Sequence, residues 1–450
     1  MTRYDGAAVL VAGAGTSGAA AARVLRDLGA SVTVVDASAE RAEALREQGF
    51  AVVDTTTPPA GTAFVVTSPG WRPDSPLLVA AAAQGLEVLG EVELAWRLRG
   101  SAPWLALTGT NGKTTTVRML TSVLQAAGHR AVAAGNVGLP LLEAVLDSDP
   151  YDVLAVELSS FQLHWSSTVV PHSAAVLNLA PDHLDWHGSM ADYAAAKARI
   201  WAGGTALGNA DDEVVRTLLS RAPGRRVTWT LHVPRPGEVG RVEDLLVDRA
   251  FADVPGEATE LATLGDLSVP GGHNVSNALA AAALARSFGV AAEAVRDGLR
   301  AFVPDPHRNA LVAEVDGVRW VDDSKATNPH AAAASLAAYD DVVWIAGGLL
   351  KGADVDELVR QAVPHLRAVV LLGTDRAELV HALSRHAPHL PVVEVSRLDT
   401  AAMTEVVAHA HRIARSGDTV LLAPAAASMD CFRDYAQRGE LFAAAVRELA

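Results

Sequence analysis

Short apolar runs alternate with stretches of helical periodicity along most of the chain. Runs with the length of buried strands cover residues 8–11, 32–35, 64–66, 87–89, 104–107, 152–156, 174–179, 318–321, 342–346, 368–372 and 419–422. Because strands of this kind alternate with helical patterns, the sequence predicts α/β domains built on largely parallel sheets. Turn-rich breaks divide the chain, and we predict three domains, at 1–98, 99–303 and 304–450. Residues 221–262 are weakly patterned and predict a peripheral hairpin region.

Composition narrows the class of protein. The chain has 450 residues, too many for one hydrophobic core, and half of them are apolar. Its net charge is −15 without a basic block, which argues against nucleic acid and anionic membrane surfaces as partners. No apolar run has the length of a membrane span, the start lacks signal-peptide features, and the lone Cys431 excludes an internal disulfide. We therefore expect a soluble, cytoplasmic, monomeric protein with no nucleic-acid partner and no membrane insertion.

The segment around Lys113 has the pattern of a phosphate-binding loop. The apolar strand at 104–107 runs into Gly109-Thr110-Asn111-Gly112-Lys113-Thr114-Thr115, and an amphipathic helix follows. In such a turn, backbone N–H groups and the helix dipole bind phosphate oxygens, the lysine neutralises the outer phosphates, and a threonine hydroxyl can bind Mg²⁺. These residues predict an ATP site, although Leu107 stands where the usual P-loop has its first glycine. The alternative is a glycine-rich turn with a surface lysine.

A second glycine motif lies near the start of the chain. The strand at 8–11 precedes Gly13-Ala14-Gly15-Thr16-Ser17-Gly18, and the strand at 32–35 ends at Asp36. This spacing predicts a βαβ unit with a diphosphate on the helix N-terminus and an acid that accepts from sugar or base. NAD and a UDP-sugar both meet that description, and the motif alone favours NAD. Ser68 follows a further strand end, where ligands of open sheets collect.

Acidic and imidazole side chains follow two strands of the central region. Glu157 stands at the carboxyl end of the strand at 152–156, where a carboxylate opposite a phosphate loop can bind Mg²⁺. The alternative for Glu157 is a neighbour of a helix cap. Asp182, His183, Asp185 and His187 crowd one loop after the strand at 174–179. The two histidines have the spacing of a zinc pair, but the lack of thiols favours a hard Mg²⁺ site, and a solvated polar loop is the remaining alternative.

Lysine is rare in this chain. Of the 37 basic residues, only Lys113, Lys197, Lys325 and Lys351 are lysines. Since arginine supplies the surface charge, lysine is expected where a compact or titratable ammonium is needed, and chance survival on the surface is the alternative. The loops that hold Lys325, Lys351 and Ser428 all follow predicted strands of the third domain. Asn274 and Asn277 begin an alanine-rich helix and either read a purine edge or cap the helix.

Taken together, these residues resemble the Mur ligase family over nearly the whole chain and in the same order. The matching segments are Gly109–Thr115, Glu157–Gln162, Asp182–Asp185, Tyr193 with Lys197, His273-Asn274 with Asn277, His307-Arg308 and Asp323–Asn328. The shortened ATP loop and the Asp-Ser-Lys-Ala-Thr-Asn segment are specific to this family, whereas the N-terminal glycines are not. The Rossmann-like first domain and the segment that ends at Ser428 point to the branch that adds D-glutamate.

The resemblance implies an α/β fold of three domains: a Rossmann-like N-terminal domain for a UDP-sugar, a central P-loop-type ATPase domain, and a C-terminal Rossmann-like α/β domain for an amino acid. It implies that ATP phosphorylates the terminal carboxylate of UDP-N-acetylmuramoyl-L-alanine and that the amine of D-glutamate attacks the acyl phosphate. Two Mg²⁺ ions assist, and the product serves peptidoglycan synthesis.

The resemblance also implies a role for each candidate residue. Implied catalytic residues are Lys113, His183 and Lys197, and implied metal ligands are Thr114, Glu157, His183 and a carbamylated Lys197. Implied ATP contacts are Gly109, Thr110, Asn111, Gly112, Lys113, Thr114, Thr115, Asn274, Asn277, Arg308 and Asp323. Implied UDP-sugar contacts are Gly15, Thr16, Asp36, Ser68, Asn136 and Ser159, and implied D-glutamate contacts are Lys325, Thr327, Lys351, Ser428 and Tyr435.

Two positions depart from the family pattern. Ala37-Ser38 stand where a polar residue and an arginine are expected to hold uracil, and Tyr435 stands where phenylalanine is frequent. Rival functions are an NAD-dependent oxidoreductase, which rests on Gly13 to Asp36, and a plain ATPase or kinase-like switch. Closer rivals are a sibling ligase that adds another amino acid, and folylpolyglutamate synthase, which normally lacks such a first domain.

Overall fold

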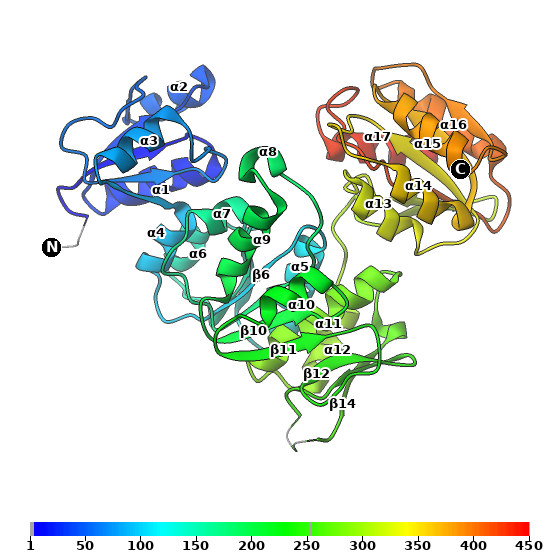
Figure 1. Ribbon diagram of the computed structural model, residues 1–450, viewed down its shortest axis with the longest axis horizontal. Coiled ribbons are helices and arrows are strands. Elements are labelled where there is room, and N and C mark those ends of the chain that lie inside the picture. The colour runs from blue at the N-terminus through cyan, green and yellow to red at the C-terminus, as the bar shows by residue number, and fades with distance from the viewer. Residues whose placement is uncertain (1–3, 253, 255, 450) are drawn as a thin grey trace. The chain divides into compact units, whose positions relative to one another are not determined.

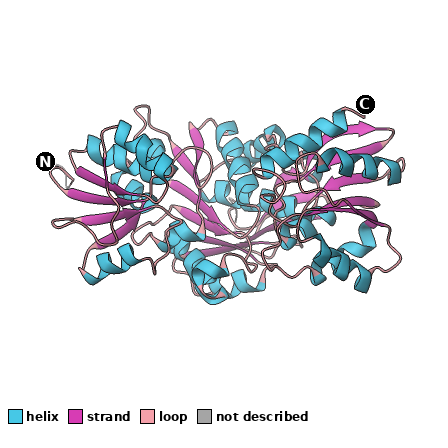
Figure 2. Ribbon diagram, turned by 90° about the horizontal axis from the view of Figure 1, so that it is seen from above, coloured by secondary structure: helices cyan, strands magenta, loops and turns pink. Residues whose placement is uncertain are grey.

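The computed structural model describes residues 4–252, 254 and 256–449. Across these residues the strands form three sheets, and Figures 1 and 2 show helices packed on their faces. The α/β fold class predicted from the sequence is confirmed. Close contacts divide the chain into two units. One unit holds the chain up to Asp266 together with Ser276–Phe302, and the other holds Leu267–Val275 and the chain from Val303 onward. The three domain boundaries stay a prediction.

The first sheet has the strand order β3-β2-β1-β4-β5, and its neighbouring strands are parallel. Its strands are β1 (Ala8–Ala12), β2 (Ser31–Val35), β3 (Ala51–Val52), β4 (Phe64–Thr67) and β5 (Glu87–Gly90). The helices that accompany it are α1 (Thr16–Asp27), α2 (Ala39–Glu47), α3 (Pro76–Ala83) and α4 (Glu91–Leu98). β1 and β4 are largely buried because their residues are almost all apolar. β1 is therefore a central strand, and the glycine motif follows its carboxyl end.

The second sheet has the order β14-β13-β12-β11-β10-β9-β6-β8-β7. Its parallel part contains β6 (Trp104–Thr108), β7 (Ala131–Gly135), β8 (Val153–Glu157), β9 (Ser173–Val176), β10 (Thr205–Asn209) and β11 (Arg225–Trp229). At one edge, β12 (Glu238–Val242), β13 (Leu245–Asp248) and β14 (Thr259–Thr263) pair antiparallel with one another. β6 lies between β8 and β9, with Leu107 opposite Glu157 and Thr108 opposite Val176. The loops after these three strands therefore meet at one edge of the sheet.

The helices around the second sheet are mostly short. They are α5 (Lys113–Ala126), α6 (Leu141–Val145), α7 (Ser160–His164), α8 (Leu184–His187), α9 (Met190–Ala198), η1 (Arg199–Trp201), α10 (Glu213–Leu219), η2 (Leu264–Asp266), α11 (Gly272–Ser287) and α12 (Ala292–Ala301). α5 packs against α12, and the hydroxyl of Ser122 donates to the carbonyl of Gly298 over 2.7 Å. α12 therefore supports α5, the helix that follows the predicted ATP loop.

The third sheet lies in the second unit and has the order β15-β16-β20-β17-β18-β19. Its strands are β15 (Ala310–Val315), β16 (Val318–Asp322), β17 (Val342–Gly347), β18 (Leu366–Leu372), β19 (Val392–Glu394) and β20 (Thr419–Leu422). The helices are α13 (Pro329–Leu336), α14 (Asp356–Ala362), η3 (Val363–His365), α15 (Arg376–His386), α16 (Ala402–Ile413) and α17 (Tyr435–Arg447). All pairs except β15 with β16 are parallel, so the loops after β16, β17 and β20 share one edge.

Among the described residues, every helix is too short or too polar to cross a bilayer.

Candidate active site

The predicted ATP loop is a tight turn between β6 and α5. Gly112 caps α5 with a left-handed backbone, at φ 81°, which favours glycine. A Cβ atom at Gly112 would lie 2.4 Å from the amide oxygen of Asn277, so a side chain has no room there. The same contact places Asn277, from α11, directly against the loop. Two residues predicted to bind ATP are therefore neighbours.

Lys113 folds back over this loop. Its ammonium donates to the carbonyl oxygens of Gly109 at 2.9 Å and Thr110 at 2.8 Å. Both acceptors belong to the loop itself, so the positive charge lies where a bound phosphate would sit.

Asn178, just beyond β9, clamps the other side of the loop. Its side-chain amide accepts from the N–H of Asn111 at 2.8 Å and donates to the carbonyl of Asn111 at 3.0 Å. Its own carbonyl accepts from the N–H of Thr110 at 3.0 Å. Asn178 was not among the predicted site residues, although its position after an apolar strand was a usable signal.

Glu157 and Thr114 form a hydrogen-bonded pair at the carboxyl edge of the second sheet. Glu157 is 1 % exposed, and one of its carboxylate oxygens accepts from the Thr114 hydroxyl at 3.0 Å. The other oxygen accepts from the side-chain amide of Asn136 at 2.8 Å. The adjacent Ser159 caps α7 in a reciprocal arrangement with Gln162. Two predicted UDP-sugar contacts, Asn136 and Ser159, thus flank the predicted metal ligand.

Lys197 is buried beneath the ATP loop. It is 2 % exposed, and its amine donates to the carbonyl of Gly109 at 2.8 Å and contacts the Thr108 hydroxyl at 3.3 Å. Burial and the nearby Lys113 ammonium hold the pKa of Lys197 well below its usual range. One turn earlier on α9, the Tyr193 hydroxyl lies 3.0 Å from that of Thr110. The environment therefore favours a neutral, nucleophilic amine at Lys197.

His183 lies at the start of α8 with a left-handed backbone, at φ 53°. Its ring packs against Phe161 and its Nε2 lies 3.5 Å from Asp182. In the described part of the chain, His, Cys, Asp and Glu side chains do not gather in threes as a ready-made metal site. Mg²⁺ commonly uses one or two protein oxygens, with water and substrate phosphates as the other ligands. The Thr114 hydroxyl and the Glu157 carboxylate fit that ion, whereas a zinc site at His183 and His187 has no such support.

The N-terminal glycine motif is closed by Asp36. Its carboxylate accepts from the N–H groups of Ala14 at 2.6 Å and Ser38 at 2.7 Å. Gly15 caps α1 and Thr16 is its first residue, while Ser68 faces the same turn with a buried hydroxyl that has no hydrogen-bond partner among the described residues. Those four residues, predicted to hold a UDP-sugar, are brought together. A buried hydroxyl of this kind needs a water molecule or a ligand group as its hydrogen-bond partner.

Arg41 is a further cation at this turn that the sequence analysis missed. It lies in the first turn of α2, with its guanidinium 3.8 Å from the carboxylate of Asp36. A Cβ atom at Gly15 would lie 3.5 Å from the same guanidinium. A guanidinium therefore lies beside the glycine turn, although no arginine directly follows Asp36.

In the second unit, the loop after β16 is heavily bonded. The Asp323 carboxylate accepts from the N–H of Asn309 at 3.2 Å, and Asn309 directly follows Arg308 in the chain. The N–H of Lys325 donates to the carbonyl of His307, and the His307 ring lies 2.6 Å from Asp322. Asn274, also in this unit, donates to the carbonyl of Pro270 at 2.7 Å.

The residues predicted to hold D-glutamate lie on the loops at the carboxyl edge of the third sheet and at the start of α17. The ammonium of Lys325 lies 3.7 Å over the ring of Tyr435. Thr327 follows in the same loop, where its N–H donates to the carbonyl of Lys325. Paired backbone hydrogen bonds between Leu349 and Ala427 join the loop of Lys351 to that of Ser428.

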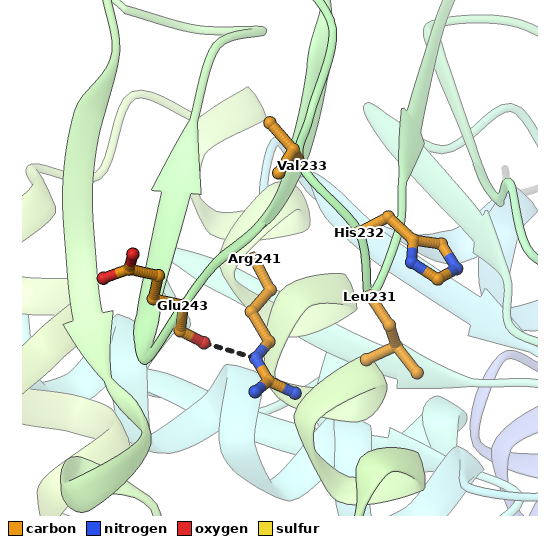
Figure 3. A pocket seen from close by; sticks show the side chains of 5 residues that line it. All are labelled: Leu231, His232, Val233, Arg241 and Glu243. Atoms are coloured by element: carbon orange, nitrogen blue, oxygen red, sulfur yellow. Dashed lines mark hydrogen bonds between the residues drawn. The ribbon is translucent and has the colours of Figure 1, made fainter.

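A separate surface hollow lies at the edge of the second sheet. It has a volume of about 460 Å³ and is lined by Leu231, His232, Val233, Arg241 and Glu243 (Figure 3). The Arg241 guanidinium donates a hydrogen bond to the backbone carbonyl of Glu243 at 2.6 Å. This hollow holds none of the candidate residues.

Comparison with known proteins decides the family. A model of the Mur ligase middle domain matches residues 107–285, and one of the Mur ligase, glutamate ligase domain matches residues 307–426. UDP-N-acetylmuramoylalanine--D-glutamate ligase of Thermobifida fusca is 63 % identical over 99 % of both chains. The chain belongs to the Mur ligase family. The resemblance noted in the sequence is therefore confirmed.

Other matches agree with this Mur ligase assignment. The enzyme of the same name from Streptomyces avermitilis is 57 % identical over 100 % of both chains. The crystal structure of UDP-N-acetylmuramate-alanine ligase MurC from Thermotoga maritima covers 98 % of this chain and 100 % of its own, with a TM-score of 0.59 at 19 % identity, which shows the fold alone. Residues 2–87 also match a model of the alanine dehydrogenase/PNT C-terminal domain, in keeping with a Rossmann-like start.

Proposed function

We propose that this chain is an ATP-dependent ligase that joins D-glutamate to the terminal carboxylate of UDP-N-acetylmuramoyl-L-alanine, in peptidoglycan precursor synthesis. The observation that carries this proposal is the assembly of Lys113, Glu157 and Lys197 around one phosphate-type loop in a chain 63 % identical to a ligase of that name. An NAD-dependent oxidoreductase would leave all three side chains without a task.

A carboxylate is a poor electrophile, so the reaction needs a leaving group on that carbon. Transfer of the γ-phosphoryl group of ATP to a carboxylate oxygen supplies one, and the amine of the amino acid then displaces phosphate to form the amide. The loop N–H groups and Lys113 are suited to bind the β- and γ-phosphates, and Asn277 lies against the same loop. Asn274, Arg308 and Asp323 are our candidates for the adenine, phosphate and ribose contacts of ATP.

The two reacting groups are both anionic, and positive charge must lie between them. Two bound Mg²⁺ ions would neutralise that repulsion. Thr114 and Glu157 would hold one ion, because they offer a hydroxyl and a carboxylate oxygen 3.0 Å apart. His183 and a carbamylated Lys197 would hold the other. The buried, weakly basic amine of Lys197 supports this modification, since only a neutral amine can add to carbon dioxide and then lose a proton.

The UDP-sugar and the amino acid would bind to different sets of residues. Gly15, Thr16, Asp36 and Ser68 are suited to a UDP diphosphate and sugar, with Asn136 and Ser159 near the acyl end. We assign the incoming D-glutamate to Lys325, Thr327, Lys351, Ser428 and Tyr435. Lys325 and Lys351, on loops at one edge of the third sheet, supply an ammonium group for each of its two carboxylates. We further propose that the enzyme acts in the cytoplasm as a monomer.

The deciding assay is ADP release with UDP-N-acetylmuramoyl-L-alanine, scanned over D- and L-amino acids. We expect release that requires Mg²⁺ and all three substrates and is greatest with D-glutamate. ATP consumption without an amino acid would favour a plain ATPase, and a preference for another amino acid would favour a sibling ligase. No ATP consumption with the complete mixture would overturn the proposal, as would stabilisation by NAD but not by the UDP-sugar.

A further inference from the structure

Arg438 is a fully buried cation in the second unit. It lies in the first turn of α17, and its side chain is 0 % exposed. Burial lowers the pKa of the guanidinium to about 10, so it remains charged at neutral pH. Among the residues that the structure describes, no carboxylate lies within ion-pair distance of it. A buried charge is costly unless hydrogen bonds and neighbouring charges compensate it, and the Asp430 and Asp322 carboxylates supply part of that compensation from beyond ion-pair distance.

The fork of this guanidinium joins two loops. Its Nε donates to the Ser324 hydroxyl at 3.0 Å and one Nη donates to the Ser324 carbonyl at 2.8 Å. The other Nη donates to the carbonyl of Ala426 at 3.1 Å. The Ser324 hydroxyl in turn donates to the carbonyl of Tyr435 at 2.8 Å. One planar group therefore fixes the spacing between the loop after β16, the loop after β20 and the start of α17.

These segments hold most of the residues proposed for the incoming amino acid. Lys325 and Thr327 follow Ser324, and Ser428 lies two residues beyond Ala426. The Lys351 loop is tied to the second of these loops through the Leu349–Ala427 pair. A displacement of either loop would therefore move ammonium and hydroxyl groups relative to one another. Since D-glutamate carries two carboxylates, their binding depends on that spacing.

We propose that Arg438 is a positioning residue of the amino-acid site, which holds the Ser324 and Ala426 loops at the spacing that D-glutamate requires. This inference rests on the proposed function. Arg438 is not proposed to contact the substrate itself. It acts through Lys325, Thr327, Ser428 and Tyr435.

The test compares Arg438→Lys and Arg438→Met with Arg447→Met, a matched change at an exposed arginine in the last turn of the same helix. We expect the KM for D-glutamate to rise about tenfold or more in both Arg438 variants. Each variant loses the planar set of guanidinium donors that joins the two loops. The KM values for ATP and UDP-N-acetylmuramoyl-L-alanine should stay within about twofold of wild type. Arg447→Met should change none of the three.

A second variant tests the same contact in case the Arg438 variants do not fold. Ser324→Ala removes one acceptor of the fork and the tie to Tyr435 while leaving the charge in place. It should raise the KM for D-glutamate about threefold and weaken the protection that D-glutamate gives against thermal unfolding. An unchanged D-glutamate KM in Ser324→Ala, or in a folded Arg438→Lys, would overturn the inference, as would an equal rise for all three substrates. Failure of the wild-type chain to ligate would instead overturn the proposed function.

Discussion

The Thr114 hydroxyl donates to the Glu157 carboxylate over 3.0 Å, which joins the first turn of α5 to the end of β8. Glu157→Gln keeps an acceptor for Thr114 but removes the negative charge. We expect ligation to fall about a hundredfold or more, since a neutral amide binds Mg²⁺ poorly, and the Mg²⁺ concentration for half-maximal activity to rise. ADP release titrated with Mg²⁺ measures both effects, with the solvent-facing Glu143→Gln as control. A normal Mg²⁺ titration would remove Glu157 from the metal site.

Lys197 should be indispensable. Lys197→Ala is expected to nearly abolish ligation, and bicarbonate should not restore it because no amine remains to be carbamylated. A short-chain carboxylic acid should restore part of the activity by supplying the missing carboxylate. Lys197→Arg should also be inactive, because guanidinium keeps the charge but does not lose its proton. Near-normal turnover in Lys197→Ala would contradict the carbamate assignment.

Arg41 should contribute to the UDP-sugar site. Arg41→Ala is expected to raise the KM for UDP-N-acetylmuramoyl-L-alanine about fivefold without changing the KM for ATP, because a cation beside Asp36 and Gly15 is lost. Arg46→Ala is the matched control, since Arg46 is similarly exposed on the same helix and pairs with Glu43. Equal effects in the two variants would show that general surface charge, and not this contact, matters.

Lys351 should act mainly on glutamate. Its backbone is left-handed, at φ 55°, a conformation that lysine and alanine both tolerate less well than asparagine. Lys351→Ala and Lys351→Asn are both expected to raise the KM for D-glutamate, because asparagine tolerates the backbone but also lacks the ammonium. Initial rates over a range of D-glutamate concentrations check this. A rise in the alanine variant alone would show that the backbone of this loop, and not the ammonium, matters, and an unchanged KM in both variants would exclude Lys351 from the site.

Glu91 should make stability depend on pH. It is 3 % exposed at the start of α4, and burial raises its pKa to about 7, while it accepts a hydrogen bond from the N–H of Leu142. The unfolded chain releases this proton at lower pH than the folded chain does, so the contribution to stability is present below pH ~4.5 and is lost between pH ~4.5 and ~7. The loss is on the order of 3 kcal/mol.

The matched variant is Glu91→Gln, which keeps the acceptor and does not titrate. The difference in unfolding free energy between Glu91→Gln and wild type should favour the variant more at pH 8 than at pH 5. Urea unfolding at both pH values measures this difference. A stability difference independent of pH would show that Glu91 is ionised throughout this range.

The parts of the site that follow one another in sequence could be predicted, and the parts that meet across the fold could not. The glycines and Lys113 define a loop by local backbone geometry alone, and Glu157 follows from its place at a strand end. Asn178 and Arg438 reach their partners across 67 and 114 residues of chain, and Arg41 meets Gly15 only once two neighbouring strands are parallel. Single-sequence patterns do not encode those pairings.

The same division holds for the fold. Most buried strands of the parallel sheets were predicted to within a residue or two because they are continuous apolar runs, as at 104–107 against Trp104–Thr108. The run at 174–179 was predicted too long, since β9 ends at Val176, and β10 at Thr205–Asn209 was not predicted. In the weakly patterned stretch 221–262, β12 and β13 do form a hairpin, but β11 pairs in parallel with β10. Its mixed Arg-Arg-Val-Thr-Trp sequence gives no sign of that direction.

The scarcity of lysine has a practical consequence. Lys197 is buried, Lys113 and Lys325 are half-buried, and Lys351 is exposed. Among the lysines, Lys351 would therefore be the first to react with amine-reactive dyes, cross-linkers and activated resins, and it lies within the segment proposed to receive glutamate. Immobilised or fluorescent preparations made in that way would report on a blocked enzyme. A cysteine introduced at the exposed Val233, which belongs to none of the segments named for substrate, would offer a different point of attachment.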